Sequence, residues 1–429
     1  MTVQRGLDTA PGTTGVVPAF CPACGAAFSA PFLDLGAVPV FCNALFPTAQ
    51  EAREAPLGEV RLAFCQECGL VANVAFFPDL VAYSPAYENS LHFSPLFRRY
   101  ADSLITDLST RYDLTGKKIV EIGAGKGDFL RLLCARTSAQ GLGFDPSYAP
   151  VPGVPSAEVG EGRDGRQTSV RFLREFYSPL HAKGADLIVC RHVLEHLPAP
   201  FAFLQSVRAA IADRHDTRLY FEVPNLRFTL AGGGIWDVIY EHCLYFAAEA
   251  LACLFEKAGF RVLDLAPAFG GQYLGVHAAP LPGGEQAGVV DGDRQDTAAR
   301  VGVADLSELT GLVHAFAEAH RVAITESATQ LDVALAAGPV AVWGAGSKGV
   351  MFLNLLPRCR EVTCAVDLNP GKQEKFVPGT AHRVIAPETL SSLSPESLPA
   401  TILVMNPLYE EEICAHIAGL GLRVSVRSV

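Results

Sequence analysis

Lys118-Ile-Val-Glu-Ile-Gly-Ala-Gly-Lys-Gly127 is the stretch of sequence that decides the fold. Its apolar residues 119–122 predict a buried strand, and apolar residues at helical spacing after Gly127 predict a helix. Glycines between a strand and a helix let the backbone come close to a ligand. Open α/β sheets bind ligands at this carboxyl end of their strands. The stretch therefore predicts a parallel-rich sheet with a binding site at residues 123–127.

A second short strand is expected to end on Asp145, whose carboxylate suits the two hydroxyls of a ribose. The compact glycine loop, with Glu121 ahead of it and Asp145 after it, resembles the S-adenosylmethionine (SAM) site of class I methyltransferases. A dehydrogenase loop fits the stretch less well, and a glycine-rich turn without a ligand is the alternative. The resemblance implies cofactor contacts from these residues: Glu121, Gly123, Ala124, Gly125, Gly127, Phe144, Asp145, Arg191 and His192.

Length and charge limit the possible partners. At 429 residues the chain is longer than a domain with one compact core, so two or three domains are expected. A net charge of −11 argues against nucleic acid as the partner, although a few local cations can still hold a small phosphorylated substrate. We find no apolar run of membrane-spanning length and no export signal. We expect a cytoplasmic monomer or homodimer that acts on a small molecule, with no membrane partner.

The cysteines predict a metal site. Four of the twelve form two Cys-x-x-Cys-Gly units, at Cys21 with Cys24 and at Cys65 with Cys68. Two such turns can present four thiolates to one ion, the closed tetrahedral geometry of structural zinc. A redox pair is the alternative, but a single redox motif would not come with a matching second one. Cys42, between the two units, is expected in the core.

The chain divides into segments of different composition. Residues 83–95 are polar and aromatic without clear periodicity, so they are either a lid over the site or an ordered connector. We expect a surface loop at 150–168 and a helix near 169–176. The expected organisation is α/β throughout the two larger domains: a disordered tail at 1–18, a zinc-binding domain with the lid at 19–95, a class I SAM-dependent methyltransferase domain at 96–280, a linker at 281–302, and a long helix with a Rossmann-like substrate-binding domain at 303–429.

A second strand–glycine–helix unit lies near the C-terminus. Gly344-Ala-Gly-Ser-Lys-Gly349, followed by Asp367 after another strand, formally fits a dinucleotide fingerprint. Such a loop can also bind a phosphate at the helix N-terminus. We favour the binding of substrate phosphate over a second cofactor, and an empty loop is the remaining possibility.

The order of these features resembles the three-domain C-methyltransferase family. The paired cysteine turns, the Glu-Ile-Gly-Ala-Gly-Lys-Gly loop, the Glu-His-x-x-Tyr-Phe box at 241–246 and the C-terminal Gly-Ala-Gly-Ser-Lys-Gly unit carry the resemblance. The best understood members of that family methylate carbon 3 of nucleotide-linked deoxy-keto-sugars through an enolate. The resemblance implies the following active-site residues: His242 as the base, Glu241 and Tyr240 as neighbours that orient or polarise, His196 in substrate binding, and Tyr87 as a tyrosine from the N-terminal domain.

The box departs from the family's wording. Where the sugar enzymes read Tyr-His-Glu-His, this chain reads Ile239-Tyr240-Glu241-His242, so the tyrosine has moved by one place. The acceptor can therefore differ while the carbon-methylating machinery is kept. The alternatives for single residues are a buried structural pair for Glu241 and His242, and a satisfied loop residue for His196.

Four functions are consistent with the sequence. The first is SAM-dependent methylation of carbon on a small activated substrate. The second is transfer of a methyl group to oxygen or nitrogen on the same scaffold. The third is an NAD-dependent oxidoreductase that uses the C-terminal fingerprint, and the fourth is a zinc-stabilised module that senses SAM. The Glu241–His242 pair counts against this last one.

Overall fold

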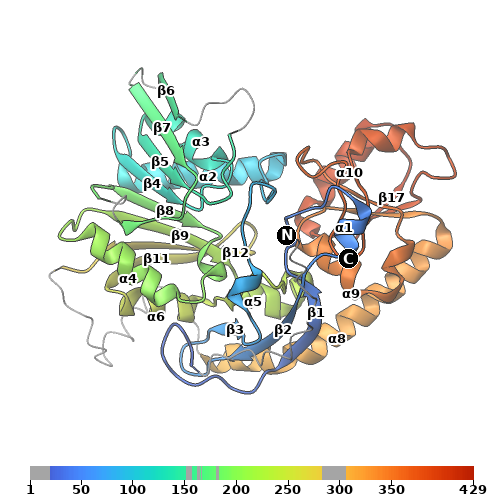
Figure 1. Cartoon of the computed structure of the whole chain (residues 1–429), viewed down its shortest axis with the longest axis horizontal. Coiled ribbons are helices and arrows are strands. Elements are labelled where there is room, and N and C mark those ends of the chain that lie inside the picture. Colours follow the sequence, from blue (N-terminus) through green and yellow to red (C-terminus); the bar gives the residue numbers. More distant parts are fainter. Residues whose placement is uncertain (1–19, 151–156, 162–164, 166, 180–182, 283–305) are drawn as a thin grey trace, which may run out of the picture.

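The computed structural model describes residues 20–150, 157–161, 165, 167–179, 183–282 and 306–429. The expected tail at 1–18 and most of the expected linker at 281–302 lie outside these residues, so their assignment stays a prediction. Three sheets organise the described chain, and Figure 1 shows the two larger domains side by side with the small N-terminal sheet below and between them.

The N-terminal domain is an antiparallel sheet that the rest of the chain completes. Its strands β1, β2 and β3 pair in sequence, and β10, from the box after the glycine-rich turn at 232–234, pairs with β3 at the edge. The expected zinc-binding domain is thus joined by a strand to the central domain. Its elements are β1 (Leu33–Pro39), α1 (Ala49–Arg53), β2 (Leu57–Phe64), β3 (Val71–Asn73) and η1 (Pro78–Leu80), with β10 at Leu244–Tyr245.

The central domain is an eight-stranded sheet in the order β11-β12-β9-β8-β4-β5-β7-β6. The five strands from β7 to β9 in this order are parallel, and β12, β11 and β6 add antiparallel edges. The elements are α2 (Pro95–Tyr112), β4 (Lys118–Ile122), α3 (Asp128–Thr137), β5 (Gln140–Phe144), β6 (Ala157–Glu161), β7 (Gln167–Leu173), β8 (Leu187–Arg191), η3 (Leu194–His196), α4 (Pro200–Ile211), β9 (Arg218–Pro224), α5 (Leu226–Phe228), η4 (Thr229–Gly233), η5 (Ile235–Asp237), α6 (Ala248–Lys257), β11 (Phe260–Ala268) and β12 (Tyr273–Pro280).

This topology confirms the predicted class I methyltransferase fold and places its binding edge. From β4 the chain crosses to β5 on one side, and later to β8 on the other, so β4 lies at the switch point where such sheets bind ligands. Ile122 of β4 lies opposite Phe144 of β5 and Cys190 of β8. The residues that follow these three positions therefore meet at one edge of the sheet.

Two predictions within this domain are wrong. The expected loop at 150–168 contains β6, and the expected helix near 169–176 is occupied largely by β7, which pairs with β5. Buried and less buried side chains alternate along β7. That period of two is the mark of a strand with one covered face.

The C-terminal domain is a five-stranded parallel sheet in the order β15-β14-β13-β16-β17. The long α8 precedes it and runs beneath the N-terminal sheet (Figure 1). The elements are α8 (Leu306–Ala337), β13 (Val340–Trp343), α9 (Ser347–Leu355), η6 (Pro357–Glu361), β14 (Cys364–Val366), β15 (Val384–Ile385), η7 (Pro387–Ser392), β16 (Thr401–Val404), η8 (Pro407–Tyr409), α10 (Glu410–Gly419) and β17 (Ser425–Ser428).

Shared hydrophobic cores fix the domains against one another. One core joins Phe64 of the N-terminal sheet to Phe316 of α8 and Phe352 of the C-terminal domain. A second joins the cysteine turns to apolar residues of the central domain, such as Phe221 of β9 and Phe255 of α6. Because burial of such surface is the main stabilising term in folding, the three domains form one packed frame. Among the described residues, no helix combines the length and apolar character needed to cross a bilayer.

Candidate active site

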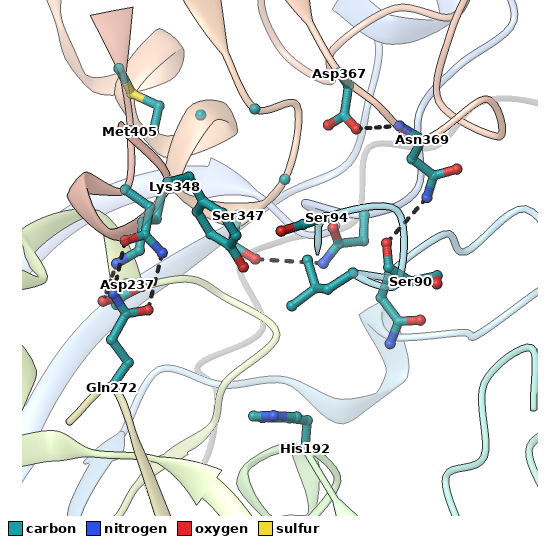
Figure 2. A pocket seen from close by; sticks show the side chains of 18 of the residues that line it. Ser90, Ser94, His192, Asp237, Gln272, Ser347, Lys348, Asp367, Asn369 and Met405 are labelled. Atoms are coloured by element: carbon teal, nitrogen blue, oxygen red, sulfur yellow. Dashed lines mark hydrogen bonds and ion pairs between the residues drawn. The ribbon is translucent and has the colours of Figure 1, made fainter. Parts of the chain in front are cut away.

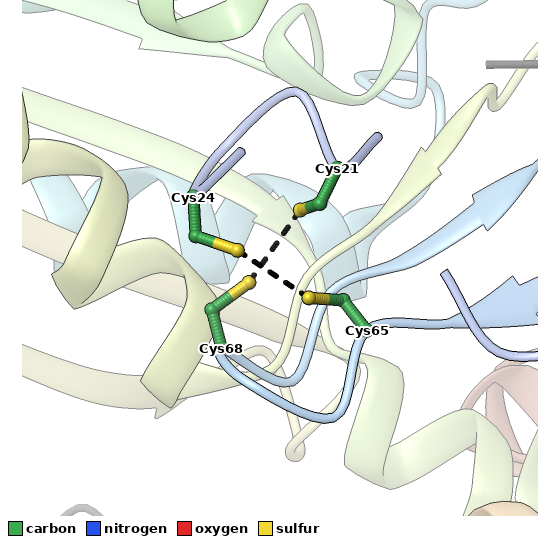
Figure 3. Close-up of side chains that lie close together, drawn as sticks. All are labelled: Cys21, Cys24, Cys65 and Cys68. Carbon is green, nitrogen blue, oxygen red and sulfur yellow. Dashed lines mark hydrogen bonds between the residues drawn. The ribbon is translucent and has the colours of Figure 1, made fainter. Parts of the chain in front are cut away.

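The four cysteines of the predicted metal site converge in space (Figure 3). The Sγ atoms of Cys21 and Cys68 lie 3.6 Å apart, and those of Cys24 and Cys65 lie 3.4 Å apart. A tetrahedron of Zn–S bonds of about 2.3 Å has edges of about 3.8 Å, close to these separations. Glycines in the left-handed region, with φ of +86° and +82°, turn the backbone after each pair. The set therefore fits a zinc ion with no open position.

The glycine loop after β4 is tied to the end of β5. The carboxylate of Asp145 accepts a hydrogen bond from the backbone N–H of Gly125 at 2.8 Å, and its other oxygen accepts from the N–H and hydroxyl of Ser147. A Cβ at Gly125 would meet only the Asn89 amide oxygen, 3.6 Å away, whereas a Cβ at Gly123 would overlap Val193. The loop thus leaves space beside Gly125, where the predicted cofactor fits.

Three buried ionisable side chains lie near this loop: Glu121, Arg191 and Glu222. Burial raises the pKa of Glu121 to about 8, and its Oε2 has no hydrogen-bond partner within the described part of the chain. The guanidinium of Arg191 lies 4.4 Å from the centre of the Phe129 ring and pairs with Glu222 at 3.0 Å. Glu222 also accepts from Tyr220 at 2.9 Å and from the Tyr100 phenol. The free oxygen of the buried Glu121 carboxyl group, which lies beside the loop, suits the amino group of a bound SAM.

His192 follows Arg191 in a conformation that few residues other than glycine adopt, with φ of +54°. Its Nε2 lies 3.1 Å from Glu222, its Nδ1 lies 3.6 Å from Glu195, and its ring contacts Tyr273. Burial alone would lower the pKa of His192, but the two carboxylates outweigh it and raise the pKa to about 9. Uncommon backbone conformations of this kind gather at functional sites.

A cavity of about 320 Å³ opens between the domains, and all three of them line it. His192 lies on one side, and Ser347, Lys348 and Asp367 lie on the other (Figure 2). A volume near 300 Å³ is that of a small-molecule site. The N-terminal domain and the segment after it contribute the following lining residues: Asn43, Tyr87, Asn89, Ser90, Leu91, Phe93 and Ser94.

His196 and His242 meet in the part of the cavity lining that the central domain provides. Their ring centres are 4.9 Å apart, and both line the cavity with Glu195. His196 Nδ1 lies 2.9 Å from the Tyr83 phenol and 2.9 Å from the backbone carbonyl of Glu241. Burial and the neighbouring His196 lower the pKa of His242 to about 3, so its imidazole is neutral at pH 7. A neutral imidazole facing a cavity can accept a proton.

The expected partnership between Glu241 and His242 is absent from the structure. One oxygen of the fully buried Glu241 accepts a 2.7 Å hydrogen bond from the backbone N–H of Cys42, in the N-terminal domain. Burial raises the pKa of Glu241, and the phenol of Tyr87 faces the same carboxyl group. Glu241 thus connects the box to the N-terminal domain, and the carboxylate near His242 is Glu195.

The segment with Tyr83 and Tyr87 lines the cavity from Tyr87 onward and contacts the glycine loop. Ser90 donates to Asp128 at the start of α3, and the Lys126 ammonium donates to the carbonyl of Pro85. The segment also reaches the C-terminal domain, where the Asn369 amide donates to Glu88 at 3.0 Å. Of the two interpretations of residues 83–95, these contacts favour the lid.

Tyr240 lies apart from the cavity lining. Its phenol accepts a hydrogen bond from the Phe77 N–H at 2.9 Å, donates to the Phe77 carbonyl, and packs its ring against Phe76. A Cβ at Gly58 would overlap its ring. These contacts give Tyr240 a place in the core under the N-terminal sheet.

The C-terminal glycine loop lines the same cavity. Asp367 accepts from the Ala345 N–H at 2.8 Å, as Asp145 does in the central domain. The ammonium of Lys372, only 4% exposed, donates to Asn43 and to the carbonyl of Ala345. Lys348 instead forms an ion pair with Asp237 at 2.5 Å. A buried cation beside a helix N-terminus suits an anionic group on a substrate.

Sequence reasoning missed three residues of this site: Tyr83, Glu195 and Lys372. The Glu-His pair at 195–196 was visible, but only its histidine was given a role. Lys372 lies outside any motif and reaches the glycine loop only through the turn after β14, so no signal in the sequence could have found it.

Comparisons with known proteins agree with this architecture. Residues 93–265 match a family described as a methyltransferase domain, and residues 301–421 match the C-methyltransferase C-terminal domain. The C-methyltransferase NovU of Streptomyces niveus is 25% identical over 395 residues, which cover 88% of this chain and 87% of NovU. The chain thus resembles C-methyltransferases in both of its larger domains and over most of its length.

Other similarities cover a smaller share of the chain. A ubiquinone biosynthesis O-methyltransferase of Actinobacillus pleuropneumoniae is 33% identical over 114 residues, which are 26% of this chain and 47% of that protein. The chain thus spans about half the length of the first curated relatives that it matches. The solved magnesium protoporphyrin IX methyltransferase of Synechocystis, with bound S-adenosylhomocysteine, is 18% identical at a TM-score of 0.32, and the match covers 43% of this chain and 84% of that chain.

Proposed function

We propose that this protein is a SAM-dependent methyltransferase that methylates a carbon atom of a small, activated keto-sugar-like acceptor linked to a nucleotide. The observation that carries the proposal is the shared cavity, whose lining includes two histidines of the central domain together with the buried Lys372 and the glycine loop of the C-terminal domain. An acceptor with a reactive head and an anionic tail matches these two sets of residues. The full-length likeness to NovU, a C-methyltransferase, supports the same class of reaction.

The cofactor end is assigned to the loop after β4. SAM supplies an electrophilic methyl group on sulfur. Asp145 would accept hydrogen bonds from the ribose, the space beside Gly125 would take the chain of the cofactor, and Glu121 would face its amino group. The lid carries Asn89 to the same loop and closes it from the side of the cavity.

The acceptor end is assigned to His242. Its neutral imidazole would take a proton from the carbon beside the acceptor's carbonyl, and the electron pair of the broken C–H bond would form an enolate. The enolate carbon then forms a bond to the methyl group while the sulfur–methyl bond breaks and its electrons stay on sulfur. His196, held by Tyr83, would orient the acceptor's oxygen.

Hydrogen exchange tests this assignment. A panel of nucleotide-linked keto-deoxysugars is incubated with the protein in D₂O without SAM, and deuterium is located by NMR. We expect exchange at the carbon beside the carbonyl, and a loss of about 10²–10⁴ in its rate for His242→Asn with SAM binding intact. Exchange that persists at the original rate in His242→Asn refutes the role of His242. Tight NADH binding with no SAM binding refutes the whole proposal in favour of an oxidoreductase.

A further inference from the structure

Glu195 is a buried carboxylate surrounded by histidines. It is 1% exposed, and neither of its oxygens has a hydrogen-bond partner among the residues that the structure describes. A carboxylate oxygen of Glu195 and ring nitrogens of His196 and His242 lie within 4.8 Å of one another. The Nδ1 of His192 lies 3.6 Å from Glu195. A buried acceptor left without donors is costly unless something charged needs it there.

His242 also lacks a hydrogen-bond partner. Its buried Nδ1 has no hydrogen-bond partner in the described chain. The carboxylate beside it in sequence, Glu241, is turned to the backbone of Cys42 and to Tyr87. If His242 accepts a proton, the resulting imidazolium is buried, and a buried charge requires a counter-charge. Glu195 is the ionised group close enough to supply it.

We infer that Glu195 is the positioning residue of the proton transfer: its carboxylate neutralises the imidazolium that forms on His242 and keeps His192 cationic. The inference rests on the proposed function. The proton moves from the acceptor's carbon to a ring nitrogen of His242, and Glu195 stays ionised throughout. This is how a buried carboxylate supports a histidine base in hydrolases.

The same three residues also form a set that divalent transition metals use, two imidazoles with one carboxylate. The neighbouring charges favour a role for Glu195 as the counter-charge of His242 over a metal site. His192 carries a positive charge next to Glu195, because its pKa is raised to about 9, and this charge repels a dication. Burial raises the pKa values of three other side chains that face Glu195, so these are neutral: Tyr83, Cys190 and Cys243.

Histidine-ring NMR tests the inference without any substrate. In protein labelled in its histidine rings, we expect His192 to titrate near pH 9, and Glu195→Gln to lower that midpoint by about one unit or more. Glu249→Gln is the matched control, because Glu249 is a buried carboxylate of the same domain that pairs with Arg227 away from the cavity lining. An unchanged His192 midpoint in Glu195→Gln overturns the inference.

Kinetics test the link to His242. With an accepted keto-sugar nucleotide, Glu195→Gln should lower kcat by about ten- to a hundredfold, because the loss of one opposite charge weakens His242 as a base by about one to two pKa units. KM and SAM affinity should not change, the acidic limb of the rate profile should move to lower pH, and Glu195→Asp should recover part of the rate. An unchanged kcat contradicts the inference.

Metal content separates the two uses of the site. We expect the same metal content in wild type and Glu195→Gln. If the wild type carries a second metal ion per chain and Glu195→Gln loses it, the three residues form a metal centre, and the inference that Glu195 is the counter-charge of His242 is overturned. If no acceptor is methylated, the proposed function fails, and the His192 titration still decides the place of Glu195.

Discussion

Replacing the aspartate of each glycine loop in turn decides which loop binds SAM. Asp145 accepts from Gly125 in the central domain, and Asp367 accepts from Ala345 in the C-terminal domain, both at 2.8 Å. The two are thus matched in geometry and differ in the domain that they serve. Asp145→Ala removes the carboxylate from the expected cofactor site, and Asp367→Ala does the same at the expected substrate site.

The size of the effect follows from the bonds that Asp145 makes. Its carboxylate holds the loop through Gly125 and Ser147, and it would also accept from the ribose of SAM. A hydrogen bond to a charged group contributes about 1.5–3 kcal/mol when it is lost without replacement. We therefore expect Asp145→Ala to weaken SAM binding by about ten- to a hundredfold, or about 1.4–2.8 kcal/mol. Asp367→Ala should leave SAM affinity within about twofold of wild type and weaken the nucleotide-linked acceptor.

Calorimetric titration with S-adenosylhomocysteine and with NADH measures both variants. Thermal unfolding of each variant without ligand shows whether a loss of affinity is only a loss of folding. If Asp367→Ala abolishes binding and Asp145→Ala does not, the assignment of the two loops is reversed and the reasoning is refuted.

Three further predictions follow from single sites. Metal analysis of purified protein should find one zinc per chain, and Cys65→Ser should lose it and unfold at lower temperature, because the cysteine turns pack on the core of the central sheet; zinc-free native protein would contradict this. Lys372→Met should raise KM for the nucleotide-linked acceptor by about tenfold and spare SAM affinity, because it removes a buried cation; an unchanged KM would remove Lys372 from the acceptor site. His192 has a folded pKa of about 9 against about 6.5 in an unfolded chain, so the stability that it contributes is full below pH ~6.5 and disappears as pH rises through 9; His192→Ala should flatten that decline in chemical denaturation, and an unchanged slope would contradict it.

The sequence predicted the elements whose signal is local. Each Cys-x-x-Cys-Gly turn and each strand–glycine–helix unit is decided within about ten residues, so the two Rossmann-like folds and the meeting of Gly125 with Asp145 could be expected. The hairpin of β6 and β7 was missed because glycine and proline upstream suggested a loop and overrode a short alternation of buried residues.

The directions of the side chains could not be predicted from the sequence. Glu241 and His242 are adjacent in the sequence, which suggested that Glu241 is the partner of His242, but the turn before β10 directs the Glu241 carboxylate toward the backbone of Cys42. It leaves Glu195, 47 positions earlier than His242, as the carboxylate near the imidazole. Such a pairing depends on how η3 and the box pack across the cleft, and no local pattern encodes it. The completion of the N-terminal sheet by β10 is non-local in the same way.

The position of the transferred methyl group tests the central claim most directly. The protein is incubated with SAM carrying a ¹³C-labelled methyl group and with a nucleotide-linked keto-deoxysugar, and the product is examined by carbon–proton correlation NMR. We predict that the label is bonded to the carbon beside the acceptor's carbonyl. In the same incubation with the His242→Asn variant, we predict that no label appears at that carbon. A label bonded to oxygen or nitrogen would contradict carbon methylation and leave only the binding of SAM to be explained.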